Sequence, residues 1–138
     1  MSLSLSNVGA ITMFVQDRHR SKQFYQNAFD LSPIFEDENS VVFKFDNTII
    51  NLLENSAAHS LIEPARVAVP ADAAADSGDL GARFQLTIDV DDVDAVCAQL
   101  AAAGVALLNG PMDRPWGIRT AAFTDPDGHI WEVAHELA

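Results

Sequence analysis

The most constraining feature of this sequence is that one order of predicted elements occurs twice. A strand, a helix and three short strands are predicted in residues 7–54, and the same order returns in residues 83–137. The segments "VQD" (15–17) and "VDD" (90–92) mark the same strand-to-helix junction and lie 75 residues apart. Such a duplication predicts two similar modules, each with one helix covering one face of its sheet and the other face left open.

Apolar runs and turn residues define the elements of the first module. Residues 7–15 are rich in β-forming side chains, and Asp17 can cap the amphipathic helix that follows. Three short β-rich segments, 32–37, 40–46 and 48–54, are separated by turn-forming residues. They predict a small antiparallel meander.

The second module repeats this pattern. Residues 83–90 predict a strand, Asp91 or Asp92 can cap the next helix, and Gly104 can end it. The last two strands are joined by "DPDG" (125–128), whose proline and glycine favour a tight hairpin turn.

Residues 55–82 interrupt the two patterns with prolines, alanines and aspartates. We expect a linker or a lid there, with a short strand at residues 65–69. The whole chain, residues 1–138, is 49% hydrophobic and is expected to form a single domain. Its parts are module one (7–54), the linker and module two (83–137).

Charge and cysteine content limit the classes of partner. The chain has 20 acidic and 8 basic residues, a net charge of −12, so nucleic acid and anionic membranes are not expected partners. The acidity serves solubility or attracts cationic ligands. No apolar run is long enough for a membrane helix and no signal peptide is visible. The single cysteine, Cys97, forms no intrachain disulfide, and a cytoplasmic location is expected.

One carboxylate lies inside an apolar strand. Glu132 stands in "IWEVA", where an unpaired carboxylate is costly. Strand alternation places Ile130, Glu132 and Ala134 on one face and Trp131 and Val133 on the other. Glu132 is therefore either a ligand-contacting carboxylate, with general-base catalysis as one role, or a solvated residue in an open trough.

Three other side chains are candidates for ligand contact. Gln85 can hydrogen-bond a ligand or be an ordinary polar surface residue. Trp116 can stack on a planar or cationic ligand, anchor its loop, or contact a second subunit. Arg119 can bind a ligand carboxylate or decorate its strand, but we favour a structural pair with Glu132, because a buried carboxylate needs a partner.

The motifs "VQDRHRSKQFYQNAFDL", "VDDVDAVCAQLAAAGV" and above all "PWGIRTAAFTDPDGHIWEV" resemble the vicinal oxygen chelate superfamily. This group includes glyoxalase I enzymes, extradiol dioxygenases, fosfomycin-resistance enzymes and bleomycin-resistance binding proteins, and the third motif is most similar to the glyoxalase-like and bleomycin-resistance-like members. The resemblance implies an α+β fold in which two βαβββ modules form a curved mixed sheet around an open pocket. It also implies a homodimer.

The resemblance further implies where a metal ion would bind. Metal-dependent members hold a divalent ion on the open sheet face, at positions that correspond here to Ala10, Asn51, Gln85 and Glu132. Alanine cannot bind a metal, asparagine binds poorly, and Gln85 with Glu132 is too few ligands for tight Zn²⁺, Ni²⁺ or Fe²⁺. No cofactor is therefore expected; His59, if the linker is a lid, is the residue that can complete a site.

Two functions stay open. The leading hypothesis is a metal-independent protein that binds a small aromatic or cationic molecule in a groove formed by Gln85, Glu132 and Trp116, with Asn51 and Arg119 as further contacts. The alternative is a metal-dependent glyoxalase-like lyase, isomerase or dioxygenase with a divergent metal site. In that case Glu132 is both metal ligand and catalytic proton shuttle.

Overall fold

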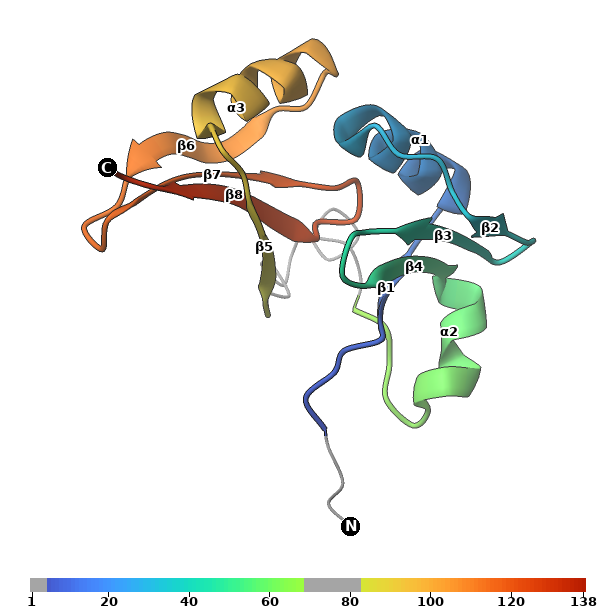
Figure 1. The fold of residues 1–138 in the computed structure, drawn as a ribbon. Coiled ribbons are helices and arrows are strands. Elements are labelled where there is room, and N and C mark those ends of the chain that lie inside the picture. Colours follow the sequence, from blue (N-terminus) through green and yellow to red (C-terminus); the bar gives the residue numbers. More distant parts are fainter. Residues whose placement is uncertain (1–4, 69–82) are drawn as a thin grey trace, which may run out of the picture. The chain divides into compact units, whose positions relative to one another are not determined.

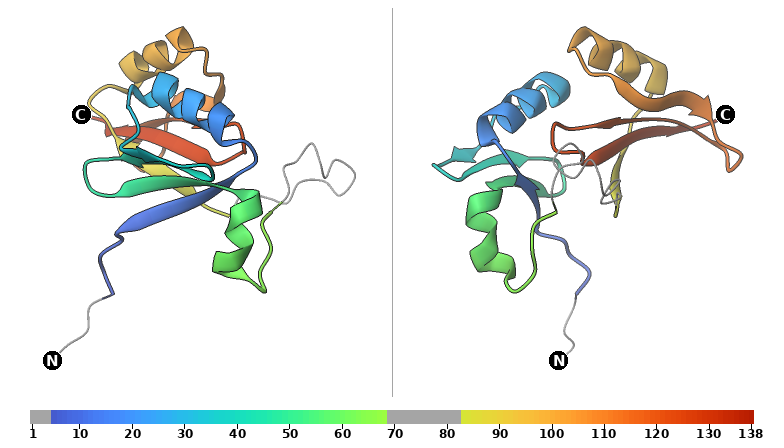
Figure 2. Two further views of the ribbon diagram at one scale, coloured as in Figure 1. Left: turned by 90° about the vertical axis from the view of Figure 1, so that its right-hand side faces the viewer. Right: turned by 180° about the vertical axis from the view of Figure 1, so that it is seen from behind.

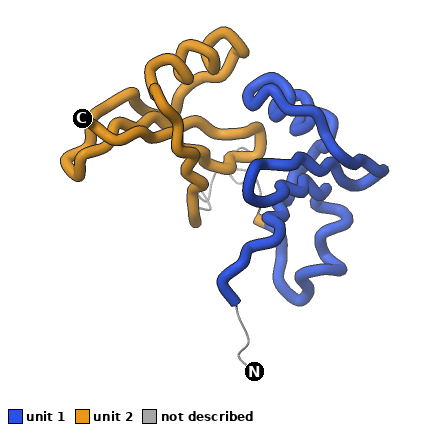
Figure 3. The backbone as a smooth tube through the Cα atoms, in the orientation of Figure 1, with its two compact units in different colours: residues 1–67 blue, residues 68–138 orange. Residues whose placement is uncertain are grey.

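The predicted duplication is present as two four-stranded mixed sheets, which confirms the predicted α+β class. The computed structural model describes residues 5–68 and 83–138. The chain divides into two compact units, residues 1–67 and 68–138, and each contains one of the sheets (Figure 3). No helix in these described ranges is long and apolar enough to cross a membrane.

The first sheet has the strand order β1-β4-β3-β2, with β1 parallel to β4 and the other neighbours antiparallel (Figure 1). Its elements are β1 (Ala10–Val15), α1 (Arg18–Phe29), β2 (Phe35–Glu36), β3 (Ser40–Lys44) and β4 (Ile49–Glu54). The antiparallel meander is therefore confirmed. The predicted cap is confirmed too, because the Asp17 carboxylate accepts the amides of His19 and Arg20 at 2.9 and 3.3 Å.

The core of the first unit forms between α1 and one face of this sheet. Tyr25 is fully buried, donates its hydroxyl proton to Met13 Sδ at 3.6 Å, and packs on Phe43 with ring centroids 5.9 Å apart. Ile50 and Leu52 of β4 are buried on this side as well. The side chains that alternate with them along β4 therefore lie on the opposite face.

The prediction that the linker begins at residue 55 is wrong. Residues 55–62 form α2 (Asn55–Ile62), which contacts β4 and β1 and fully buries Ala58. Helices α1 and α2 lie on opposite sides of the first sheet (Figures 1 and 2). The alanines favour a helix, and the apolar residues recur at helical spacing. The prediction gave more weight to the prolines that follow and therefore missed this helix. Residues 65–68 are not a strand, and the remaining linker residues lie outside the described part of the chain.

The second sheet repeats the topology in the order β5-β8-β7-β6, again with one parallel pair, β5 and β8. Its elements are β5 (Gln85–Asp89), α3 (Val93–Ala102), β6 (Leu107–Asp113), β7 (Ile118–Thr124) and β8 (Ile130–Glu136). Asp92 caps α3 by accepting the Ala95 amide at 3.2 Å, and Gly104 follows the helix at φ +83°, both as predicted.

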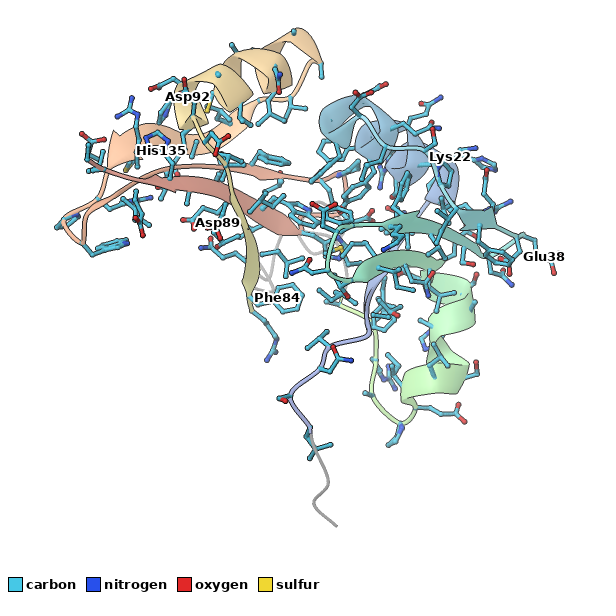
Figure 4. The ribbon with its side chains drawn as sticks, in the orientation of Figure 1. Lys22, Glu38, Phe84, Asp89, Asp92 and His135 are labelled. Carbon is cyan, nitrogen blue, oxygen red and sulfur yellow. The ribbon has the colours of Figure 1, made fainter. Side chains whose placement is uncertain are left out.

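Both units hold the first amide of their helix with a side chain from the end of the last strand. The Arg18 amide donates to Glu54 Oε2 at 3.1 Å in the first unit, and the Val93 amide donates to His135 Nδ1 at 2.8 Å in the second. His135 and Asp92 both lie near the start of α3 (Figure 4). Each contact satisfies an amide that has no partner inside its own helix.

The turn between β7 and β8 is organised by a buried aspartate. One Asp125 carboxylate oxygen accepts the amides of Asp127 and His129, both at 2.9 Å, and the other lies 2.7 Å from His129 Nδ1. Gly128 adopts φ +89°, the conformation predicted for the turn. Burial by itself lowers the pKa of His129, but the hydrogen bond and charge of Asp125, with the charge of Asp127, outweigh burial and raise it above its ordinary value.

Candidate functional site

The face of the second sheet opposite α3 carries a polar row at its centre. Glu132 is half-buried, and its Oε1 accepts a hydrogen bond of 2.9 Å from the hydroxyl of Thr87, its register partner on β5. On the other side Glu132 is paired with Ala122 of β7, and Ala122 with Asn109 of β6. The row therefore crosses all four strands. We call this surface the Glu132 face.

Strand alternation explains why Glu132 lies on this face. Trp131 and Val133 are almost fully buried on the side that packs against α3, and His135 bonds to the first residue of that helix. Glu132 lies between Trp131 and Val133 in sequence and therefore points to the opposite side. The predicted division of β8 into two faces is confirmed.

Two further polar side chains lie on the same face of the edge strand β5. Gln85 is the register partner of Ile130, Asp89 is the partner of Ala134, and both are exposed. Figure 4 shows Asp89 at the far end of β5 from Phe84. Gln85 and Asp89 therefore flank Thr87, and Asp89 adds a second carboxylate to the Glu132 face.

An arginine that the sequence analysis did not select also reaches this face. Arg114 Nε donates to the hydroxyl of Thr120 at 2.9 Å, and its guanidinium carbon lies 5.8 Å from the centroid of the Trp116 ring. Thr120 pairs with Ala134, in the row next to that of Glu132. Trp116 itself is 67% exposed, so it is not a core residue that anchors its loop.

The predicted pair between Arg119 and Glu132 is wrong. Arg119 lies on the α3 side of β7, where it donates to Asp94 at 2.9 and 3.1 Å and to Asp113 at 2.8 Å. The hydrogen bonds raise the pKa of Arg119, and the bond to Asp94 has the larger effect. Arg119 in turn lowers the pKa of Asp94. Two carboxylates already occupy the guanidinium, so Arg119 belongs to the packing of α3 and not to the Glu132 face.

Gln85 and Trp116 lie at opposite ends of the second sheet. Gln85 is beside Ile130, whereas Trp116 precedes Ile118, the partner of Glu136. The stretch of β8 from Ile130 to Glu136 spans about 20 Å at the usual rise of a strand. A groove that includes Gln85, Glu132 and Trp116 therefore has to run along most of the length of β8.

Asn51 has the position in the first unit that Glu132 has in the second. It pairs with Thr12 across β1 and β4, as Glu132 pairs with Thr87 across β5 and β8. The Asn51 Oδ1 atom is buried and has no hydrogen-bond partner among the residues that the structure describes. The two units therefore share a register but differ in charge at this position.

The donors at the positions implied for a metal ion do not fit a resident divalent cation. Ala10 offers no donor, and of the two polar residues of the second unit Gln85 is neutral, which leaves Glu132 as the one charged ligand of this set. The other candidates, Asn51 and His59, belong to the first unit, where His59 is exposed on α2. The described ranges contain no group of three His, Cys, Asp or Glu side chains arranged to hold a metal ion.

Strand alternation by itself places Thr87 on the face of Gln85, but sequence reasoning did not select Asn109, Arg114 or Thr120. These three depend on how β6, β7 and β8 pair, and the register of β6 shifts on both sides of Asn109. No local pattern reveals such a shift.

Comparison with protein families gives one match across nearly the whole chain. The model of the Glyoxalase/Bleomycin resistance protein/Dioxygenase superfamily matches residues 7–133. The uncharacterized protein YraH of Bacillus subtilis (strain 168) is 32% identical over 127 residues, which are 89% of this chain and 93% of that protein.

Solved structures show the same fold. A glyoxalase/bleomycin resistance protein/dioxygenase from Nocardioides has a TM-score of 0.83 at 18% identity, covering 99% of this chain and 87% of that one. A glyoxalase-related enzyme from Fulvimarina pelagi has a TM-score of 0.79 at 24% identity, covering 96% and 89%. Lactoylglutathione lyase from Agrobacterium tumefaciens has a TM-score of 0.67 at 20% identity, covering 96% and 95%.

Proposed function

Because the chain belongs to the Glyoxalase/Bleomycin resistance protein/Dioxygenase superfamily, we propose that it binds a small organic cation on the Glu132 face without a metal ion. The main support for this proposal is the environment of the Glu132 carboxylate. Its carboxylate is half-buried, accepts one hydrogen bond from Thr87, and has no cationic partner among the residues that the structure describes. A carboxylate in such a position favours binding of a positive charge.

The surroundings of Glu132 support a positively charged ligand. The bond from Thr87 goes to Oε1 and orients the carboxylate, while Oε2 has no hydrogen-bond partner in the described residues. Asp89 adds negative charge on the same face, and the net charge of −12 attracts cations at longer range. An ammonium group that donates to Oε2 therefore gains a charge-assisted hydrogen bond.

The proposal extends to location and assembly. We propose a cytoplasmic homodimer, in which a second copy of the chain contacts exposed surface such as the edge strands β2 and β5. Burial raises the pKa of the Cys97 thiol, which is consistent with an inert cysteine in a reducing compartment. Light scattering coupled to size-exclusion chromatography tests the assembly: a monomer mass across the micromolar range contradicts it.

Binding of benzylamine to protein treated with chelator and desalted tests the function. Isothermal titration should detect benzylamine and not benzyl alcohol, which has the same ring without the charge. Glu132→Gln should weaken benzylamine binding about tenfold or more, because a charge-assisted bond is lost. Glu38→Gln removes an exposed carboxylate from the first unit (Figure 4) and should leave binding unchanged.

Two results contradict the proposal. Equal binding of benzylamine by the wild type and Glu132→Gln places the ligand elsewhere. Binding that appears only after Zn²⁺, Ni²⁺, Mn²⁺ or Fe²⁺ is added supports the metal-dependent lyase, isomerase or dioxygenase instead.

A further inference from the structure

We propose that the natural ligand of the Glu132 face is a zwitterion, whose cationic group binds Glu132 and whose anionic group binds Arg114. The cationic half of this inference rests on the proposed function. The anionic half rests on separate observations at Arg114, and it assigns a chemical class of ligand that carries both charges.

Arg114 is held in place but is not neutralised. Its Nε bonds to Thr120 Oγ1 at 2.9 Å and its guanidinium lies over the Trp116 ring at 5.8 Å. Neither partner is a carboxylate, and its two terminal nitrogens have no hydrogen-bond partner in the described ranges. Arg18 and Arg119, by contrast, form ion pairs with Glu54 and with Asp94 and Asp113.

An arginine with this set of contacts is organised to bind an anion. The bond to Thr120 and the contact with Trp116 restrict the guanidinium plane before any ligand arrives. The free terminal N–H groups then match the two oxygens of a carboxylate or phosphate in a bidentate geometry. A lysine or a freely mobile arginine lacks this restriction.

The register of β7 and β8 sets the separation of Glu132 from the threonine that holds Arg114. Thr120 lies opposite Ala134, and Glu132 is two residues earlier on β8. Such diagonal neighbours are roughly 7–8 Å apart. The structure shows no ion pair between Arg114 and Glu132; each is held by a different threonine hydroxyl.

The residues between the two charges are small. Thr120 pairs with Ala134, and Glu132 pairs with Ala122, so two alanines lie beside the two polar residues. Thr120, Ala122 and Ala134 are themselves almost fully buried, whereas the side chains of Glu132 and Arg114 are partly exposed. A ligand with its charges separated by a ring or a short chain therefore meets these two side chains above the alanines, whereas a simple amine leaves Arg114 without a partner.

Four small probes separate the two halves of the inference. Benzylamine carries the cation alone and benzoate the anion alone. The para-(aminomethyl)benzoate carries both charges on opposite sides of the ring, and the ortho isomer carries both charges close together. Isothermal titration of the full chain should find the para compound at least about tenfold tighter than benzylamine, with no such gain for the ortho compound.

Variants assign the gain to one residue. Arg114→Gln should remove the advantage of the para compound over benzylamine. Arg114→Lys, which keeps the charge but not the paired N–H groups, should retain part of it. Lys22→Gln removes a cation from α1, where it pairs with Glu36, and is the matched control. Thermal unfolding checks that each variant is folded, and the comparison of probes on the wild type needs no variant.

The outcomes distinguish this inference from the proposed function. If benzylamine binds and the para compound is no tighter, the anionic half is overturned while the cation site stands. The anionic half is also overturned if the para compound keeps its advantage in a folded Arg114→Gln. If neither benzylamine nor the para compound binds, the proposed function itself is overturned.

Discussion

The hydroxyl of Thr87 donates a hydrogen bond of 2.9 Å to Oε1 of Glu132, across the parallel strands β5 and β8. The equivalent pair in the first unit, Thr12 and Asn51, shares the register but carries no carboxylate. The duplicated scaffold therefore places a threonine beside a polar residue twice, and only the second copy offers a negative charge. The two units thus share a register but differ in charge at this position.

Loss of the Thr87 hydroxyl should weaken cation binding without unfolding the protein. In Thr87→Val the Glu132 carboxylate loses the bond that orients it, and we expect benzylamine affinity to fall about threefold to tenfold. Thr12→Val changes the equivalent residue of the first unit and should not affect affinity. Equal losses in both variants would show that Thr87 has no specific role.

Replacement of His135 by alanine should destabilise the protein, whereas replacement by glutamate should retain most of its stability. His135→Ala leaves the Val93 amide without its acceptor, at a cost of about 1 kcal/mol in the free energy of unfolding. His135→Glu copies Glu54 of the first unit, adds a negative charge at a helix N-terminus and should recover most of that loss. Urea denaturation measures both; if glutamate is as destabilising as alanine, the equivalence of the two caps is wrong.

Glycine is required at position 110 for two reasons. It has φ +85°, and a Cβ atom there would lie 2.5 Å from the carbonyl oxygen of Thr120 and 2.8 Å from Cα of Ala121. Gly110→Ala should lower the free energy of unfolding by about 3 kcal/mol, combining backbone strain with overpacking. Gly104→Ala, at φ +83° with nothing within 4 Å, is the control and should cost about 1 kcal/mol. Similar losses in the two variants would rule out the steric contribution.

The contribution of His129 to stability should decrease as pH rises. Because the folded protein holds the pKa of His129 above its ordinary value of 6.5, protonated His129 stabilises the native state. This stabilisation is complete below the ordinary pKa and is lost as pH rises through the raised one. The wild type should exceed His129→Asn in unfolding free energy by more at about pH 5.5 than at about pH 8.5.

The exposed His19 provides the control for that measurement. His19→Asn makes the same substitution at an exposed histidine in the first turn of α1 and controls for the effect of the substitution itself. A difference between wild type and His129→Asn that is constant with pH, or that grows as pH rises, would contradict the role of the bond between His129 and Asp125.

Local chemistry in the sequence was enough to predict the residues that cap two helices, the glycine that ends one of them and the two faces of β8. Asp17 and Asp92 cap their helices and Gly104 ends one, because capping depends on a few neighbouring residues. The face of Glu132 follows from the two-residue period of a strand. The same reasoning failed for α2, where a helical pattern of only eight residues preceded a proline-rich stretch.

Only the tertiary structure decided which side chains meet. Arg119 pairs with Asp94 and Asp113 and not with Glu132, since the pairing of β7 with its neighbours and with α3 sets which face it shares. Arg114 reaches the Glu132 face through Thr120, because the pairing of β6 with β7 sets Met112 opposite Thr120 and Asp113 opposite Arg119. The sequence by itself determined the duplicated modules and the two faces of β8, because those depend on residues close in the chain. The composition of the site depends on the register between strands, which forms over long separations and is decided only when the sheets fold.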